Sequence, residues 1–247
     1  MKIVFHPDFH TVYTSDPAAS EGRMAAILDA IEDRYPMVTA RPATDAEIAR
    51  AHVESHMAAV QHKKLHEIAA LAAGGSIQAA EIGLTEPAFA LVRPPGHHAS
   101  AQSAWGFCYY CNMAVALLSL RERGMIRSAF VLDFDLHYGD GNVNILGHRD
   151  WATLHNPKER DRHAYVRNVA QLLSATDYDI IGISAGFDHH VDDWGGLLET
   201  EDYAAMGAIV RAAADRSGGG CFAILEGGYN HRTIGACAAA LLEGMDG

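Results

Sequence analysis

The sequence predicts one α/β domain: a central, mainly parallel sheet of about eight strands with helices on both faces. Short apolar runs with strand character alternate with longer stretches of helical spacing along the 247 residues. This alternation is typical of parallel strands joined by crossover helices. Proline and glycine gather at strand ends, and no linker, low-complexity tract or repeat divides the chain. We therefore expect residues 1–247 to form a single domain.

The individual elements follow from local pattern and from start and stop signals. The expected strands cover residues 3–5, 37–40, 88–92, 129–132, 151–154, 179–184 and 221–225. The expected helices cover residues 21–34, 44–73, 77–84, 112–123, 143–146, 163–173, 201–216 and 233–243. Ser20 is placed to cap the first helix, and Gly74 and Gly75 are placed to end the long second one.

The composition limits the class of protein. Hydrophobic residues make up 49% and charged residues 20%, as in a globular protein with a sizeable core. No uninterrupted apolar run is long enough for a membrane span, and the first residues read as a strand rather than a signal peptide. Four cysteines in that setting predict reduced thiols and a cytoplasmic location. The net charge of -12 argues against a nucleic-acid partner and is compatible with a cationic substrate, or simply with solubility.

Four loops carry most of the polar chemistry. They cover residues 93–106, 133–140, 184–196 and 226–231, and each follows an expected strand. Because functional loops of a parallel sheet lie beyond the carboxyl ends of the strands, we expect all four at one edge.

The loop at 133–140 holds the strongest single signal. Asp133, Asp135 and His137 alternate, so on a continuing strand they would face one side. Asp135 and His137 offer the oxygen and imidazole donors of a metal site. The alternative is a strand end with a few solvated polar residues, but the density of acid and imidazole favours metal binding.

The other loops add groups that are weak alone. His97 and His98 are adjacent imidazoles that suit a pair of bases, Asp188 follows a strand where a third ligand fits, and Tyr229 follows two glycines. Each has an ordinary alternative, such as a hydrogen-bonded histidine or a turn cap. Their placement after successive strands makes them a set.

Five motifs in order carry a family resemblance that spans nearly the whole chain. They are RPPGHHA at 93–99, GFCYYCN at 106–112, VLDFDLHYGDG at 131–141, SAGFD at 184–188 and LEGGYN at 225–230. With them, the chain resembles the histone deacetylase and acetylpolyamine amidohydrolase family, within the arginase/deacetylase fold.

The resemblance implies a catalytic Zn²⁺ held by Asp135, His137 and Asp188, with Fe²⁺ or Co²⁺ acceptable to the same ligands. A structural K⁺ is also implied, held by backbone oxygens and a hydroxyl. Its ligands would come from Asp133, Asp135, His137, Leu154 and the Thr153 side chain.

The resemblance also implies the acid–base groups. His97 and His98 would be the general base and acid pair, with Asp133 bonded to His97 and Asp140 bonded to His98. Tyr229 would donate its hydroxyl to the oxyanion.

The implied reaction is hydrolysis of an N-acyl, most simply N-acetyl, amide. Phe107 would line the channel and the Gly106 carbonyl would accept the amide N–H. The substrate would be a small-molecule or peptide acyl-amine, and a homo-oligomer is compatible with the sequence.

The chain departs from its relatives in several places. Most of them carry a long glycine-rich loop where residues 158–163 lead directly into a helix here, so we expect a shallower, more open pocket unless another subunit covers it. Tyr138 replaces a common histidine and Cys111 a common asparagine, which affects packing more than chemistry. Trp194 is either a pocket rim or part of a solvated loop.

Other pairs have plainer interpretations. Cys108 and Cys111 form a Cys-x-x-Cys, for which buried inert thiols are favoured over a redox pair or a structural zinc site. The i,i+4 histidine pairs favour a solvated helical face over a metal site. These pairs are His52/His56 and His62/His66.

Two further functions stay open at this point. An arginase-like dinuclear ureohydrolase shares the fold but needs more bridging carboxylates. A non-catalytic module that binds acylated or amine ligands would not need every catalytic position, yet all are filled.

Overall fold

The protein, described here as a computed structural model of residues 1–247, is built on a seven-stranded parallel sheet with the order β2-β1-β3-β7-β6-β4-β5. This confirms the expected fold class, with every strand pair parallel. The strands are β1 Lys2–Phe5, β2 Met37–Thr39, β3 Ala88–Ala90, β4 Ala129–Asp133, β5 Ala152–His155, β6 Ile180–Ala185 and β7 Gly220–Leu225.

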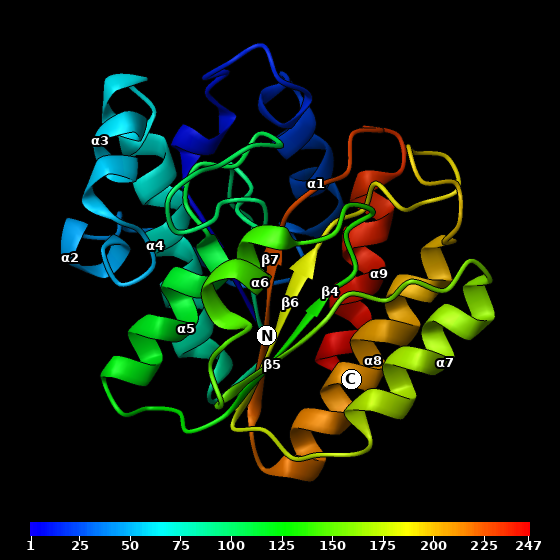
Figure 1. Cartoon of the computed structure of the whole chain (residues 1–247). Coiled ribbons are helices and arrows are strands. Elements are labelled where there is room, and N and C mark those ends of the chain that lie inside the picture. The colour runs from blue at the N-terminus through cyan, green and yellow to red at the C-terminus, as the bar shows by residue number, and fades with distance from the viewer.

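Helices cover both faces of the sheet (Figure 1). One face carries α2 Asp45–Ile48, α3 Glu54–His62, α4 His66–Gly83, α5 Asn112–Glu122 and α6 Asp140–Leu146. The other carries α1 Arg23–Ile31, α7 Arg162–Leu173, α8 Thr200–Ser217 and α9 Ile234–Asp246. Two short 3₁₀ helices, η1 Pro7–His10 and η2 Pro17–Ala19, follow β1. No helix is both long and apolar enough to cross a membrane.

The central strands are buried on both faces, which explains their continuous apolar runs. Every residue of β3, β4 and β6 is buried. The helices contribute apolar faces to the same core, which joins both sides of the sheet in one cluster. This rigid centre supports the loops at the strand ends.

The long helix expected at 44–73 is wrong. The chain forms α2, α3 and α4 instead, with breaks at 49–53 and 63–65, and Lys64 adopts a left-handed φ of 58°. Gly74 and Gly75 lie inside α4 rather than at its end, and the helix expected at 77–84 is the second half of α4. A Cβ at Gly74 would clash with the backbone of residues 41–43, so the glycine permits close packing of the helix.

Two other boundaries differ from expectation. The first helix starts after Gly22, and Ser20 instead lies 3.1 Å from the His231 ring through its hydroxyl. The strand β4 ends at Asp133, so Asp135 and His137 belong to the following loop rather than to a continuing strand.

Candidate functional site

The four polar loops meet at the carboxyl edge of the sheet. They follow β3, β7, β6 and β4, which are consecutive neighbours in the sheet order. Parallel pairing places the carboxyl ends of these strands side by side. The fold thereby brings all ten predicted site residues into one region.

Asp135, His137 and Asp188 form a compact group of metal-type donors. One ligand atom from each lies within 4.8 Å of the others. The His137 Nδ1 is 3.3 Å from Asp135 Oδ1 and 3.1 Å from Asp188 Oδ2. Both carboxylates are buried, whereas the His137 side chain is 38% exposed and faces the cavity.

The electrostatics of this group favour a bound cation. Burial, together with the charge of Asp135, raises the pKa of Asp188 to about 6. Hydrogen bonds to Asp135 and Asp188 raise the pKa of His137 to about 10. Two buried carboxylates side by side repel each other, and a divalent ion relieves that repulsion. Two carboxylates and one imidazole are a donor set that fits Zn²⁺.

His97 and His98 each face a different carboxylate. His97 Nδ1 is 3.3 Å from Asp133 Oδ2, and His98 Nδ1 is 2.7 Å from Asp140 Oδ1. The ring centroids of the two histidines are 4.0 Å apart. These two histidine–aspartate pairs are the arrangement that the family resemblance implies.

The two imidazoles differ in basicity. Burial lowers the pKa of His97, but the charges of Asp135 and Asp133 more than offset this and hold it well above its usual value. Burial, with the adjacent His97 as the second cause, lowers the pKa of His98 to about 4. In the metal-free protein the pair can therefore hold one proton between them.

An aromatic cavity of about 310 Å³ opens above these groups. Tyr229 stands between Trp194, stacked at 4.0 Å between centroids, and Phe107, edge-on at 6.0 Å. Trp194 therefore forms a wall of the cavity. Its full lining is Pro95, His97, His98, Trp105, Gly106, Phe107, His137, Trp194, Gly227 and Tyr229. The volume lies near the lower end for ligand pockets.

Gly106 and Phe107 both adopt left-handed backbone conformations beside His98. Their φ angles are 58° and 67°. A Cβ at Gly106 would collide with the His98 ring, so only glycine allows this approach. The Gly106 carbonyl already accepts the Cys108 thiol at 3.4 Å, and its second lone pair remains for another donor.

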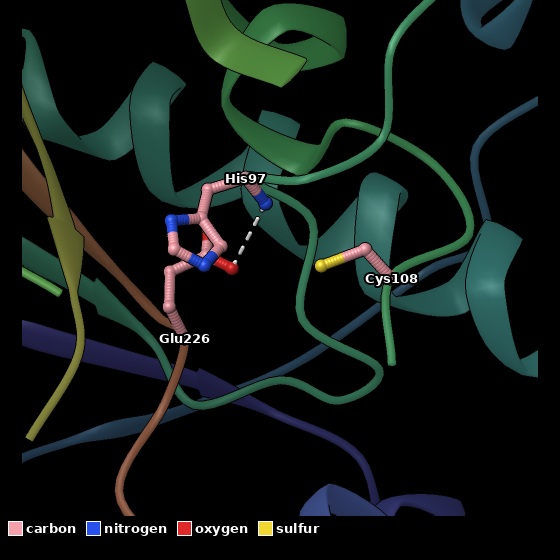
Figure 2. A group of neighbouring side chains, drawn as sticks. All are labelled: His97, Cys108 and Glu226. Atoms are coloured by element: carbon pink, nitrogen blue, oxygen red, sulfur yellow. Dashed lines mark hydrogen bonds between the residues drawn. The ribbon is translucent and has the colours of Figure 1, made fainter. Parts of the chain in front are cut away.

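A second group of donors consists of His97, Cys108 and Glu226, from the segments that follow β3 and β7 (Figure 2). Glu226 Oε2 accepts the backbone N–H groups of Gly96 at 2.6 Å and His97 at 3.1 Å. Burial raises the pKa of Glu226 to about 7 and that of Cys108 well above its usual value. Metal ligands must lose their protons, which burial opposes for both Glu226 and Cys108. Through these bonds, Glu226 joins the loop that follows β7 to the loop that follows β3.

Sequence reasoning missed three residues of the site. Trp105 lines the cavity, Asp193 binds the backbone of Tyr229, and Glu226 binds that of His97. No local pattern predicts these contacts, because each joins residues 35 or more positions apart in the sequence.

The four cysteines and the His52/His56 pair all lie in the protein interior. All four cysteines are free and buried, as favoured for Cys108 and Cys111. The solvated face expected for the histidine pairs is wrong for His52 and His56, which are 4% and 6% exposed. His52 lies in the break between α2 and α3, His56 lies in α3, and both bind the loop that follows His98. His52 Nε2 accepts the Cys111 N–H at 2.9 Å, and His56 donates to the Tyr109 carbonyl at 2.7 Å.

The K⁺ site stays a prediction. Pairing of β4 with β5 sets Leu154 beside Val131 and Thr153 beside Phe130, two and three residues before Asp133, where β4 ends. Thr153 is exposed.

Comparisons with known proteins agree with this geometry. The sequence profile described as "Histone deacetylase domain" matches residues 18–165 and 152–245. The chain is 28% identical to a histone deacetylase-like amidohydrolase of Pseudomonas aeruginosa, over 91% of this chain and 75% of that protein. It is 29% identical to a probable deacetylase of Methanothermobacter thermautotrophicus, over 73% of this chain and 65% of that protein. The crystal structure of the HDA15 HD domain superposes with a TM-score of 0.85 at 25% identity, over 98% of this chain and 88% of that one.

Proposed function

Because this chain belongs to the histone deacetylase family, we propose that it is a metal-dependent amidohydrolase. It cleaves N-acyl amides, most simply N-acetyl amides, of lysine-like or polyamine substrates. One observation carries the proposal: a single aromatic cavity is lined at once by a metal-type donor, two histidines paired with aspartates, and a tyrosine. An amide is a poor electrophile with a poor leaving group, so its hydrolysis needs all of these groups together.

Asp135, His137 and Asp188 would hold the metal, with Zn²⁺ favoured and Fe²⁺ or Co²⁺ compatible. When bound there, such an ion supplies a Lewis acid for the amide carbonyl and the attacking water. The protein's part is to hold three donors in place. The Gly227 N–H donates to Asp135 Oδ2 at 2.8 Å and the Leu136 N–H to Asp188 Oδ1 at 3.1 Å.

The two histidines exchange protons with water and with the leaving amine. Asp133 and Asp140 fix the Nδ1–H tautomer of each ring, which turns Nε2 toward the reacting atoms. His98 is unprotonated at neutral pH because burial and His97 lower its pKa. It can therefore take a proton from water and return one to the amine nitrogen.

Tyr229 is the donor for the negative charge that develops on the carbonyl oxygen. Burial raises the pKa of its phenol, so the hydroxyl stays protonated. Phe107 and Trp194 pack on its ring and hold it toward the cavity. The Gly106 carbonyl, on the same rim, would accept the amide N–H of the substrate.

A panel of acyl amines tests the proposal. Amine release is measured from an acetyl-lysine peptide, a longer acyl-lysine peptide, N-acetylputrescine and N-acetylspermidine. The enzyme hydrolyses at least one of them, and Tyr229→Phe loses roughly 100-fold in kcat through loss of the oxyanion donor. Tyr178→Phe removes a hydroxyl at the amino end of β6, far from the site, and keeps wild-type turnover. Binding of the acyl amines without turnover would instead favour a binding module.

A further inference from the structure

Trp105, His98 and Asp140 form a closed triangle at the cavity wall. The indole of Trp105 is stacked on the His98 ring, with centroids 3.8 Å apart and planes 28° from parallel. Its Nε1–H donates to Asp140 Oδ2 at 2.9 Å. The other oxygen of the same carboxylate, Oδ1, is 2.7 Å from His98 Nδ1. One tryptophan therefore contacts both members of the histidine–aspartate pair.

The exposed fractions of these three side chains show what the Trp105 indole contributes. His98 is 3% exposed, whereas Trp105 is 55% exposed, so the indole separates the imidazole from solvent. The Asp140 side chain is 40% exposed. A partly exposed carboxylate rotates readily, and its hydrogen bond to a neighbouring imidazole is weak. A second bond from a rigid indole fixes its plane and directs Oδ1 at the histidine.

The backbone around Trp105 is itself held in place. Ala99 and Ala104 form an isolated antiparallel bridge, and the Ser100 N–H donates to the Ser103 carbonyl at 2.8 Å. On the other side, the N–H groups at the start of α6 donate to the His97 carbonyl, from Gly141 at 2.9 Å and Asn142 at 3.2 Å. The loop of His98 and the helix of Asp140 are thus joined, and the indole closes the remaining gap.

We propose that Trp105 is a positioning residue for the His98–Asp140 pair, acting through its indole N–H as well as through stacking. This inference rests on the proposed amidohydrolase function. Trp194 provides the internal comparison, because it stacks on Tyr229 in a similar way but its indole N–H makes no hydrogen bond within the protein. Trp194 only packs on the Tyr229 ring, whereas Trp105 also orients the Asp140 carboxylate.

The hydrogen bond from the Trp105 indole to Asp140 is tested without any substrate, by ¹⁵N–¹H spectra of the metal-free protein. The chain has three tryptophans, and Trp105→Phe identifies the indole signal of Trp105. That signal is downfield and exchanges slowly with water despite the exposed ring. Asp140→Ala moves it upfield and speeds exchange, whereas Asp192→Ala, at an exposed aspartate near the same rim, leaves it in place. A signal that does not respond to Asp140→Ala overturns the proposal, whatever the activity measurements give.

The effect on the reaction is tested by a double-mutant cycle. Trp105→Phe keeps an aromatic ring but loses the donor, and lowers kcat by roughly 5- to 50-fold with KM within about threefold. In an Asp140→Ala background the same change alters kcat by less than about twofold, because the bond it removes is already gone. Trp151→Phe, remote from the cavity, retains wild-type kinetics. An equal loss of kcat in both backgrounds, or a change in KM alone, shows that Trp105 lines the cavity without positioning the His98–Asp140 pair. Absence of turnover in the wild type rejects the proposed function and leaves the spectroscopic test standing.

Discussion

The carboxylate of Asp193 accepts the backbone N–H of Tyr229 at 2.8 Å, and the same oxygen accepts the N–H of Asn230 at 2.8 Å. Its other oxygen accepts the N–H of Trp194. Two glycines precede Tyr229, so the loop has little stiffness of its own. Asp193 thus sets the position of the proposed oxyanion donor and of the indole stacked on it.

Replacing Asp193 with alanine should lower turnover without removing the metal. We expect kcat to fall roughly 10- to 100-fold, because small displacements of the oxyanion donor are costly. Metal content, measured by mass spectrometry, stays at the wild-type value. Asp192→Ala is the matched control, since that side chain is exposed. Equal turnover in the two variants would show that Asp193 does not position Tyr229.

Gly106→Ala should abolish activity and lower stability more than the same change at Gly124. The added Cβ would collide with the His98 ring, at a residue whose φ is already 58°. Gly124→Ala carries the same kind of backbone penalty, with a φ of 68°, but meets no atom within 4 Å. Each loses about 1 kcal/mol of unfolding free energy or somewhat more through its φ. Only Gly106→Ala loses turnover, and retained activity there contradicts the described contact.

Glu226→Gln should change how stability depends on pH in the chelator-treated protein. Burial raises the pKa of Glu226 to about 7, above its value in the unfolded chain, so the folded state binds the proton more tightly. The stabilisation is fully present below the unfolded pKa and is lost as pH rises through about 7, on the order of 3 kcal/mol in total.

Denaturant titrations from pH 4 to pH 8.5 measure this dependence. Glutamine imitates the protonated acid and keeps an acceptor for the Gly96 and His97 N–H groups, so the variant loses less stability than the wild type across that range. Glu122→Gln, at an exposed position on α5, keeps the wild-type slope. Parallel curves for Glu226→Gln and wild type would show that the carboxyl ionises normally.

The two glycines of α4 should differ in their tolerance of alanine. A Cβ at Gly74 meets the backbone of residues 41–43, whereas one at Gly75 meets the Val92 methyl at 3.0 Å and Ala40 Cβ at 3.2 Å. Backbone cannot shift as a side chain can, so Gly74→Ala loses roughly 1–3 kcal/mol of unfolding free energy despite the better helix propensity of alanine. Gly75→Ala loses less. The reverse order in thermal or denaturant unfolding would contradict the packing described.

The architecture and the edge that carries the site could be predicted from sequence because they follow from local pattern. Apolar strands alternate with helices, and the polar motifs stand directly after β3, β4, β6 and β7. The donors of the metal group and the two histidine–aspartate pairs come from such motifs. Parallel pairing alone brings these motifs together at one edge of the sheet.

What escaped prediction depends on contacts between distant segments. Gly74 and Gly75 look like a helix end, yet they allow α4 to approach the 41–43 backbone. Ser20 looks like a cap but contacts His231. No motif marks Trp105 or Asp193, because their hydrogen-bond partners are 35 and 36 residues away in the sequence. Only the folded chain reveals these pairs.

Metal reconstitution tests the central proposal most directly. The chelator-treated protein is titrated with Zn²⁺, and separately with Co²⁺ and Fe²⁺, while bound metal and amine release are measured on the same samples. We predict that activity appears with the metal and reaches its plateau at one equivalent per chain, and that Asp188→Ala neither binds that equivalent nor recovers activity. Activity that requires two equivalents, or that survives complete removal of metal, would contradict it.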